Sequence, residues 1–236
     1  MTKNIVFMSE NEFIHSAIKP YSSAKNYIPD WYKKSPFWVD DKKFSRNNVG
    51  LPDLAIKACV PFLDCLTSGY ILELWCDIKV FKDENGETKV VWFNPWSDPV
   101  RKRDSHVAEF LPTPLGCSSD HFVWAIPYGI RTPAGYSVLF THPFNRFDLP
   151  FTTLSGVVDT DGNGMFGGNI PVFFDKDFEG IIPVGTPIVQ ILPFKRDDWK
   201  SETENNELNY KTIKYAIGKY VYGAYKRFNW HKKKFD

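Results

Sequence analysis

The stretch from Arg131 to Arg196 reads RTPAGYSVLFTHPFNRFDLPFTTLSGVVDTDGNGMFGGNIPVFFDKDFEGIIPVGTPIVQILPFKR, and its pattern predicts the fold. Short runs rich in Val, Ile and Phe alternate with turns of Gly, Pro, Asn and Asp, which is typical of all-β domains. We therefore expect a mainly β fold with a barrel or sandwich core. Pro133–Phe140 is expected to be a tight turn that feeds a strand, and Ser155–Asp161 a buried strand that ends in an acidic turn. Two further strands are expected at Ile170–Phe174 and Thr186–Leu192.

A helix is expected ahead of this core. Asp53 can cap a helix over Leu54–Leu66, whose apolar residues fall on one face, and Pro61 inside it implies a kink or an early stop. Further upstream, Trp31 and Trp38 are bracketed by prolines. We expect their rings to anchor this segment against the core, because large rings bury more often than they bind ligands.

A hairpin is expected next. Tyr70–Phe81 alternates apolar and polar residues as one half-buried strand, Asn85-Gly86 is a hairpin turn, and Thr88–Phe93 is the returning strand. The helix and the hairpin would form an N-terminal layer against the core. Residues 94–120 are expected to be a long connection with at most one short strand.

A basic helix is expected at the other end of the core, over Glu204–Phe228, where an apolar stripe recurs with helical spacing. Its many lysines fit a solvated face, and contact with nucleic acid or another acidic surface is the alternative. We expect one domain over 1–236, with a β core and its N-terminal layer in 50–195 and the C-terminal helix in 204–230.

The composition excludes several classes of protein. Lys and Arg total 29 against 28 for Asp and Glu, so no global field attracts nucleic acid or an anionic membrane. No apolar run approaches the roughly 18 residues of a membrane span, and we expect a soluble protein made in the cytoplasm without a membrane partner. The four cysteines fit neither a zinc pattern nor a disulfide scaffold, and buried free thiols are expected. The aromatic content of 17% predicts large buried rings or an aromatic interface.

The acidic turn that starts at Asp159 has three interpretations. The run Asp159-Thr-Asp161-Gly-Asn163-Gly matches the first half of a calcium loop, but Ile170 stands where the bidentate Glu belongs. A plain turn, in which the carboxylates bind their own backbone, is the preferred interpretation, and a catalytic carboxylate is the third. His106, His121 and His142 lack zinc spacing, and no metal site is predicted.

The runs Gly156-Val-Val-Asp159 and Gly185-Thr-Pro-Ile-Val-Gln190 resemble two motifs of deoxyuridine triphosphatases and their dCTP deaminase relatives, over residues 131–195. The resemblance implies a dUTPase-like barrel of the jelly-roll or β-clip type, commonly trimeric. It also implies that Asp159 matches the aspartate that activates water beside Mg²⁺-bound phosphates, and that Gln190 matches a buried glutamine near the site. Asn145, Arg146, Asp161 and Gln190 are the ligand-binding candidates.

Three parts of that family's pattern are absent. The Arg-Ser phosphate motif has Pro143-Phe-Asn-Arg146 as its nearest candidate, Gly162 replaces the aromatic residue under the deoxyribose, and a basic helix replaces the Gly-rich closing motif. Most of the chain after about residue 50 also resembles an uncharacterised family of tailed bacteriophages.

From these observations we expect a non-catalytic phage protein in the virion or the host cytoplasm. It would be a homo-oligomer that acts as a virion component, assembly component or binding module and needs no cofactor. The alternative is a nucleotide hydrolase or deaminase-like enzyme, with Asp159 as its base and Mg²⁺ as its cofactor.

Overall fold

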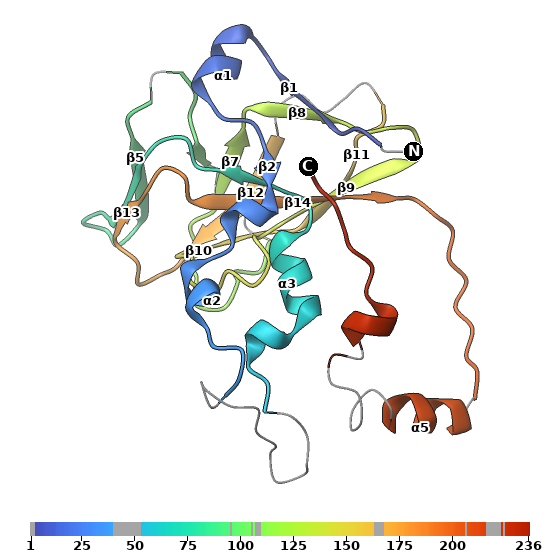
Figure 1. Ribbon diagram of the computed structural model, residues 1–236. Coiled ribbons are helices and arrows are strands. Elements are labelled where there is room, and N and C mark those ends of the chain that lie inside the picture. The colour runs from blue at the N-terminus through green and yellow to red at the C-terminus, as the bar shows by residue number, and fades with distance from the viewer. Residues whose placement is uncertain are drawn as a thin grey trace.

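The computed structural model describes residues 3–39, 53–94, 96–104, 106, 110–162, 168–205, 207–215, 223 and 225–236. The fold is mainly β, as predicted, and its strands form antiparallel sheets (Figure 1). The barrel expectation is wrong for this part of the chain. In each described sheet the first strand does not pair with the last, so the sheet keeps two open edges and does not close into a barrel.

The largest sheet has five strands in the order β11-β9-β14-β3-β2. Its two longest members were predicted: Tyr136–Thr141 is β9 and Pro187–Lys195 is β14. The turn into β9 uses Gly135 at φ 82°, a left-handed conformation that glycine adopts without a steric penalty. The remaining strands are β2 (Ser22–Ser23), β3 (Tyr70–Glu73) and β11 (Gly156–Asp159).

The second sheet has four strands in the order β10-β12-β7-β6. The predicted strand Ile170–Phe174 lies within β12, which spans Gly168–Phe174. The long connection 94–120 contains one short described strand, as predicted, in β6 (Val100–Lys102). The other two strands are β7 (Phe122–Ile126) and β10 (Phe151–Thr153).

The expected strand Tyr70–Phe81 is wrong as one element. It breaks after Glu73, so β3 joins the five-stranded sheet while β4 (Ile78–Lys82) joins a separate sheet ordered β13-β4-β5. The hairpin itself is confirmed, since β4 pairs with β5 (Thr88–Trp92) around the predicted turn. Its third strand is β13 (Gly180–Ile182), and β1 (Val6–Ser9) pairs with β8 (Tyr128–Arg131) in a small fourth sheet.

Buried side chains from the two larger sheets form one hydrophobic core. Trp124 of β7 lies at its centre, fully buried and edge-on to Phe151 and Phe174. Two consecutive buried hydrogen bonds join the two larger sheets. The Trp124 indole donates to the Thr153 hydroxyl at 3.0 Å, and that hydroxyl donates to the Ile188 carbonyl at 2.8 Å. The aromatic content therefore serves the core in part, as expected.

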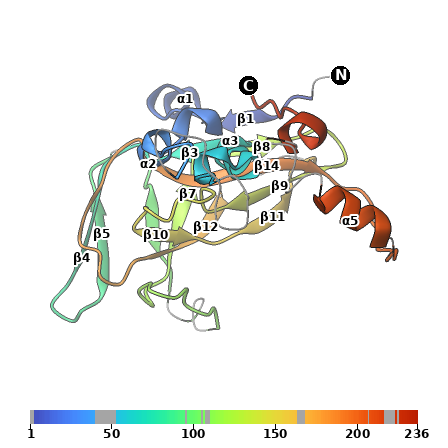
Figure 2. The same cartoon turned by 60° about the horizontal axis from the view of Figure 1, so that its bottom comes forward.

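The described helices near the N-terminus gather on one side of the sheet that holds β14 (Figure 2). They are α1 (Glu12–Ala17), α2 (Asp30–Lys34) and α3 (Val60–Thr67), with 3₁₀ turns at Ala24–Tyr27 and Ile56–Ala58. The Trp31 ring lies edge-on to Phe62 of α3 but is 37% exposed, so the expected anchoring of Trp31 against the core is not found.

The predicted cap of the helix after Asp53 is wrong. Cys59 occupies the N-cap of α3, and Pro61 lies in its first turn instead of kinking it, where its missing N–H costs nothing. The cysteines are free as expected, but Cys59 and Cys65 are exposed, which corrects the expectation that all four are buried.

The C-terminal region differs from the prediction of one long, buried helix over Glu204–Phe228. The described part of it holds α5 (Glu207–Tyr215) and a π-helical turn at Tyr225–Asn229. Residues 216–222, in the middle of the predicted helix, lie outside the described residues. Phe228 of the expected buried stripe is 73% exposed. In the described residues, no helix has the length and apolar character needed to cross a membrane.

Candidate functional site

Asp159 and Asp161 lie together where β11 ends, as the sequence predicted. Asp159 is the last residue of β11 and faces Ser137 of β9 across the sheet, and Asp161 follows in the bend. The expectation of a buried strand is wrong, because β11 is an edge strand with exposed residues. The pair of carboxylates therefore sits at the open margin of the five-stranded sheet.

Arg196, just past the end of β14, holds both carboxylates. Its guanidinium forms a two-point ion pair with Asp161, one contact measuring 3.1 Å, and approaches Asp159 Oδ1 at 3.2 Å. The buried Ser137 hydroxyl donates to the same Asp159 oxygen at 2.6 Å. The Gly135 amide donates to Asp161 at 2.7 Å. The main partners of the two carboxylates thus come from Ser137 of β9, from Gly135 just before β9 and from Arg196 just after β14, and the backbone of Asp161 itself contributes less.

The ion pair sets the charge of this cluster. Hydrogen bonds from Arg196 and then from the Gly135 amide lower the pKa of Asp161 to about 2. Asp161 is therefore ionised at neutral pH, and its negative charge is paired with the Arg196 guanidinium. Asp159 is less enclosed, with 71% of its side chain exposed.

The calcium interpretation can be tested only in part, because residues 163–167 of the half-loop lie outside the described residues. Within the rest of the chain, no three His, Cys, Asp or Glu side chains converge on a position that could hold a metal ion. Arg196, which supplies the positive charge beside Asp159 and Asp161, lies more than thirty positions further along the sequence.

Gln190 is buried, as the resemblance implies, and its amide is fully engaged. Its oxygen accepts from the Phe144 amide at 2.7 Å, and its nitrogen donates to the carbonyls of Cys65 and Ser68 at 3.0 and 2.6 Å. The side chain thus fastens α3 and the loop after β9 to β14. Three matched hydrogen bonds explain why a polar residue is tolerated in the core.

Asn145 and Arg146 shape the loop after β9. Arg146 N–H donates to the Pro143 carbonyl at 3.2 Å, and Asn145 has φ 59°, which is the geometry of a type II turn. The Arg146 guanidinium grips Asp148 through two contacts of 2.9 Å. The Arg146 hydrogen bonds lower the pKa of Asp148 despite the opposing effect of burial.

The candidate residues therefore form two groups instead of one site. In the β9–β14 pair, Gln190 faces Thr141 whereas Phe194 faces Ser137, the neighbour of Asp159. Four residues along a strand correspond to about 13 Å. Asp159 and Asp161 make one group, and Asn145, Arg146 and Gln190 make the other.

A hollow of about 320 Å³ adjoins Arg146 and is also lined by His142, Cys117 and Phe147. Both nitrogens of the His142 ring already have hydrogen-bond partners. Nε2 donates to the Arg146 carbonyl at 3.0 Å, and Nδ1 accepts from the Thr153 amide at 3.3 Å. Burial raises the pKa of the Cys117 thiol. A protonated thiol beside an engaged imidazole does not make a nucleophile.

Two structural residues of these clusters were missed in the sequence, Arg196 and Ser137. Nothing local marks them, since each acts across a strand pairing that forms only on folding. Comparison of the chain with protein-family models and with curated proteins finds no match.

Proposed function

We propose that this protein is a non-catalytic binding or assembly module, and that it serves as a virion or assembly component of a bacteriophage. The observation that carries the proposal is the pairing of Arg196 with Asp159 and Asp161. A general base needs a carboxylate held beside water or a metal-bound phosphate, whereas here an internal guanidinium pairs with both carboxylates and offsets one of their two negative charges.

Exposed apolar side chains support a docking role. Phe93, Val91 and Ile181, on or beside the three-stranded sheet β13-β4-β5, are all exposed, with Phe93 at 92%. Register places Ile181, Lys79 and Val91 in one row on the same face of that sheet. Apolar groups gathered on a projecting sheet mark protein interaction surfaces more often than catalytic ones.

The test separates this role from the enzyme alternative. We expect no release of phosphate, pyrophosphate or ammonia when the unaltered protein is incubated with each deoxynucleoside triphosphate and Mg²⁺. Hydrolysis or deamination that disappears in Asp159→Asn, but persists in the matched surface variant Asp177→Asn, would replace the proposal with the enzyme. Mass spectrometry of purified phage particles should find the chain if it is a virion component.

A further inference from the structure

The end of the chain concentrates positive charge. The last twelve residues, Tyr225-Lys-Arg-Phe-Asn-Trp-His-Lys-Lys-Lys-Phe-Asp236, hold five of the 29 Lys and Arg residues but one of the 28 Asp and Glu residues. The rest of the chain therefore has more acidic than basic side chains. A basic segment at one end of an acidic chain is typical of a site for a polyanion, because clustered cations attract counter-charged ligands locally. We call residues 225–234 the basic segment.

Four of the five cations have no carboxylate partner in the part of the chain that the structure describes. Each is exposed, and none forms an ion pair or a side-chain hydrogen bond there. They are Lys226, Arg227, Lys232 and Lys234. Because no internal carboxylate offsets their charge, they can contact phosphate groups without giving up an existing pair.

Exposed aromatic rings interleave with these cations. Tyr225 and Phe228 lie in the π-helical turn, with Lys226 and Arg227 between them, and the Phe228 ring is 73% exposed. A solvated lysine face needs no such rings, since exposing a phenyl group to water is unfavourable. Rings flanked by cations are the arrangement in which bases stack on the aromatic faces while neighbouring phosphates meet the charges.

The basic segment is fastened to α3 through Asp64. The Trp230 indole donates to the Asp64 carboxylate at 2.9 Å, and the Lys233 ammonium pairs with the same carboxylate at 2.6 Å. Trp230 is partly buried, unlike Phe228. One ring and one cation of the segment thus serve its attachment, and the other rings and cations remain exposed.

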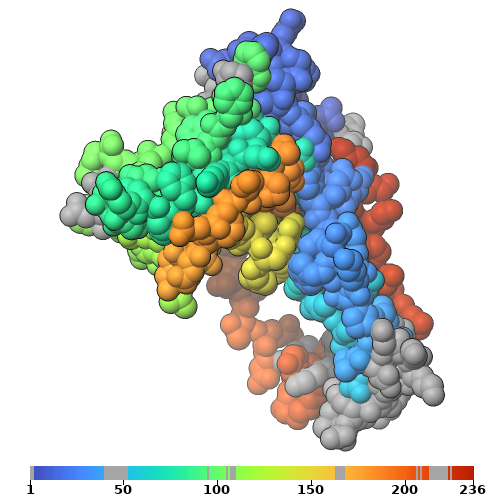
Figure 3. Space-filling view, turned by 90° about the vertical axis from the view of Figure 1, so that its left-hand side faces the viewer, coloured from blue at the N-terminus to red at the C-terminus, as the bar shows by residue number. Residues whose placement is uncertain are grey.

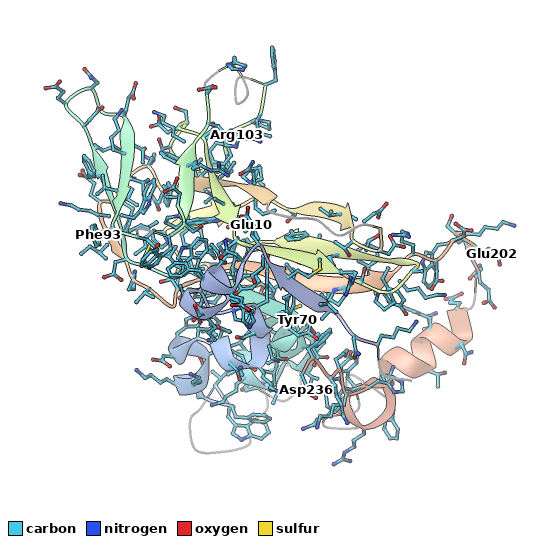
Figure 4. The ribbon with its side chains drawn as sticks, turned by 90° about the horizontal axis from the view of Figure 1, so that it is seen from above. Glu10, Tyr70, Phe93, Arg103, Glu202 and Asp236 are labelled. Carbon is cyan, nitrogen blue, oxygen red and sulfur yellow. The ribbon has the colours of Figure 1, made fainter. Side chains whose placement is uncertain are left out.

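The last two residues continue this attachment. The Phe235 ring lies edge-on to Tyr70 with centroids 5.9 Å apart, and Lys25 pairs with Asp236 at 2.6 Å. Figure 3 shows the C-terminal residues, in red, beside the N-terminal residues, in blue, and Figure 4 places Asp236 near Tyr70 and away from Phe93. A segment fixed in this way presents its cations at defined positions, which reduces the ordering cost of binding.

The local structure favours a single strand over other polyanions. The described end of the chain is a five-residue π-helical turn followed by residues 230–236 without secondary structure. A DNA duplex is read by a helix or a two-stranded ribbon in its major groove, and an anionic membrane is bound by an amphipathic helix. A turn with exposed rings suits bases that are splayed out instead, as they are in a single strand.

We propose that the basic segment binds single-stranded nucleic acid. Phe228 and Tyr225 stack on bases, and the four unpaired cations contact phosphates. This inference rests on the proposed binding role and names the class of its partner. It also explains how a chain with almost no net charge binds a polyanion, because the charge that acts on the ligand is local.

Fluorescence anisotropy of the full chain with a labelled oligothymidylate of about 20 nucleotides tests the proposal. Four phosphate contacts predict a slope of about −3 when the logarithm of the association constant is plotted against the logarithm of the salt concentration. Binding should therefore weaken about 50-fold between about 50 and 200 mM salt.

Removal of charge tests the cations. Lys226→Gln combined with Arg227→Gln should weaken binding and reduce the salt slope by about half, because two of the four phosphate contacts are lost. The matched control is Lys79→Gln combined with Lys176→Gln. It removes two exposed lysines, from β4 and from the turn after β12, and should leave the affinity and the slope unchanged.

Removal of a ring tests the stacking. Phe228→Ala should weaken binding about tenfold and leave the salt slope unchanged, because it removes a stacking face but no charge. Phe93→Ala is the matched control, since that ring is 92% exposed and lies away from Asp236 in Figure 4. Thermal melting of every variant shows whether the fold is kept.

Two results would overturn the inference. One is the absence of oligonucleotide binding by about 100 µM protein at about 50 mM salt, and the other is binding that neither the charge removal nor Phe228→Ala weakens. Competition identifies a different class of partner. Polyglutamate or phosphatidylglycerol vesicles that bind more tightly than the oligonucleotide would assign the basic segment to an acidic protein or to a membrane, and would also overturn the inference.

Failure of this inference is distinguishable from failure of the proposed function. A chain that does not bind the oligonucleotide, lacks nucleotide turnover and is found in purified particles would remove the nucleic-acid contact and leave the proposed function standing. Nucleotide turnover that disappears in Asp159→Asn would remove the proposed function. Oligonucleotide binding that Phe228→Ala weakens would support the inference in either case.

Discussion

The guanidinium of Arg196 and the carboxylate of Asp161 form a two-point ion pair that joins the end of β14 to the turn after β11. Among the described strands, the edge strand β11 pairs with β9 alone, and this contact adds to the hydrogen bonds between Thr132 and Thr160 in holding its end. The two carboxylates thus connect the end of an exposed edge strand to the end of β14.

Asp161→Asn should lower the melting temperature more than Asp159→Asn does. Asp161→Asn removes the two-point ion pair with Arg196 and weakens the hydrogen bond from the Gly135 amide, whereas the Asp159 side chain is mostly exposed. The pKa of Asp161 in the folded protein, about 2, lies below its ordinary value near 3.9, so its stabilisation is complete above about pH 4 and is lost as the pH falls to about 2. Urea midpoints between pH 5 and 2 should fall less steeply for Asp161→Asn than for the unaltered protein.

Gln190→Leu should cost about 3 kcal/mol of unfolding free energy, because the Phe144 amide and the Cys65 and Ser68 carbonyls lose this partner in partly buried hydrogen bonds. Urea denaturation measures the change. Gln190→Glu is the matched control for shape. It keeps an acceptor for Phe144 but loses both donated bonds, so it should also destabilise. A neutral result for both variants would mean that the three contacts are not needed to hold α3.

The strands of the core were predictable because each is a short apolar run between turn residues. Tyr136–Thr141 and Pro187–Lys195 were located by that pattern, as was the hairpin around Asn85-Gly86. The break between Glu73 and Ile78 was not predictable, because alternation continues through it while the chain passes from one sheet to another.

The site was less predictable than the fold. Spacing placed Asp159 and Asp161 in one turn, but the sequence contains no signal that Arg196 returns to them from the end of another strand. The burial of β11 was misjudged for a related reason. Val157 and Val158 suggest a core strand, whereas strand order alone decides which strand lies at an edge.

Gly69→Ala should prevent folding. Gly69 has φ 74°, and a Cβ there would lie 1.9 Å from the Ile191 carbonyl oxygen, a backbone atom of the paired strand β14 that cannot move aside. Gly86→Ala is the matched control at the hairpin tip, with φ 76° and no atom within 4 Å of the added Cβ. It should cost only about 1 kcal/mol. Soluble yield and circular dichroism distinguish the two outcomes, and a folded Gly69→Ala protein would contradict the close approach.

The protein should lose stability as the pH falls below about 6.5 because of two histidines. Burial, with a smaller effect from Arg103, lowers the pKa of His121, and burial lowers the pKa of His142. A lowered pKa means that the unfolded chain binds the proton more readily. The folded state is therefore fully favoured above the ordinary pKa near 6.5 and loses stability as the pH falls from there toward the folded value.

His121→Phe tests this and should both stabilise the protein and flatten its pH dependence between pH 7 and 5. The His121 ring is 3% exposed, both of its nitrogens lack a hydrogen-bond partner, and it stacks on Phe173 with centroids 5.1 Å apart. Phenylalanine keeps the stack and removes the unpaired polar atoms, which cost about 1–3 kcal/mol when buried. Urea midpoints at pH 7, 6 and 5 measure both effects. An unchanged slope would assign the acid sensitivity to His142 alone, and a destabilised variant would show that the imidazole nitrogens are satisfied in solution.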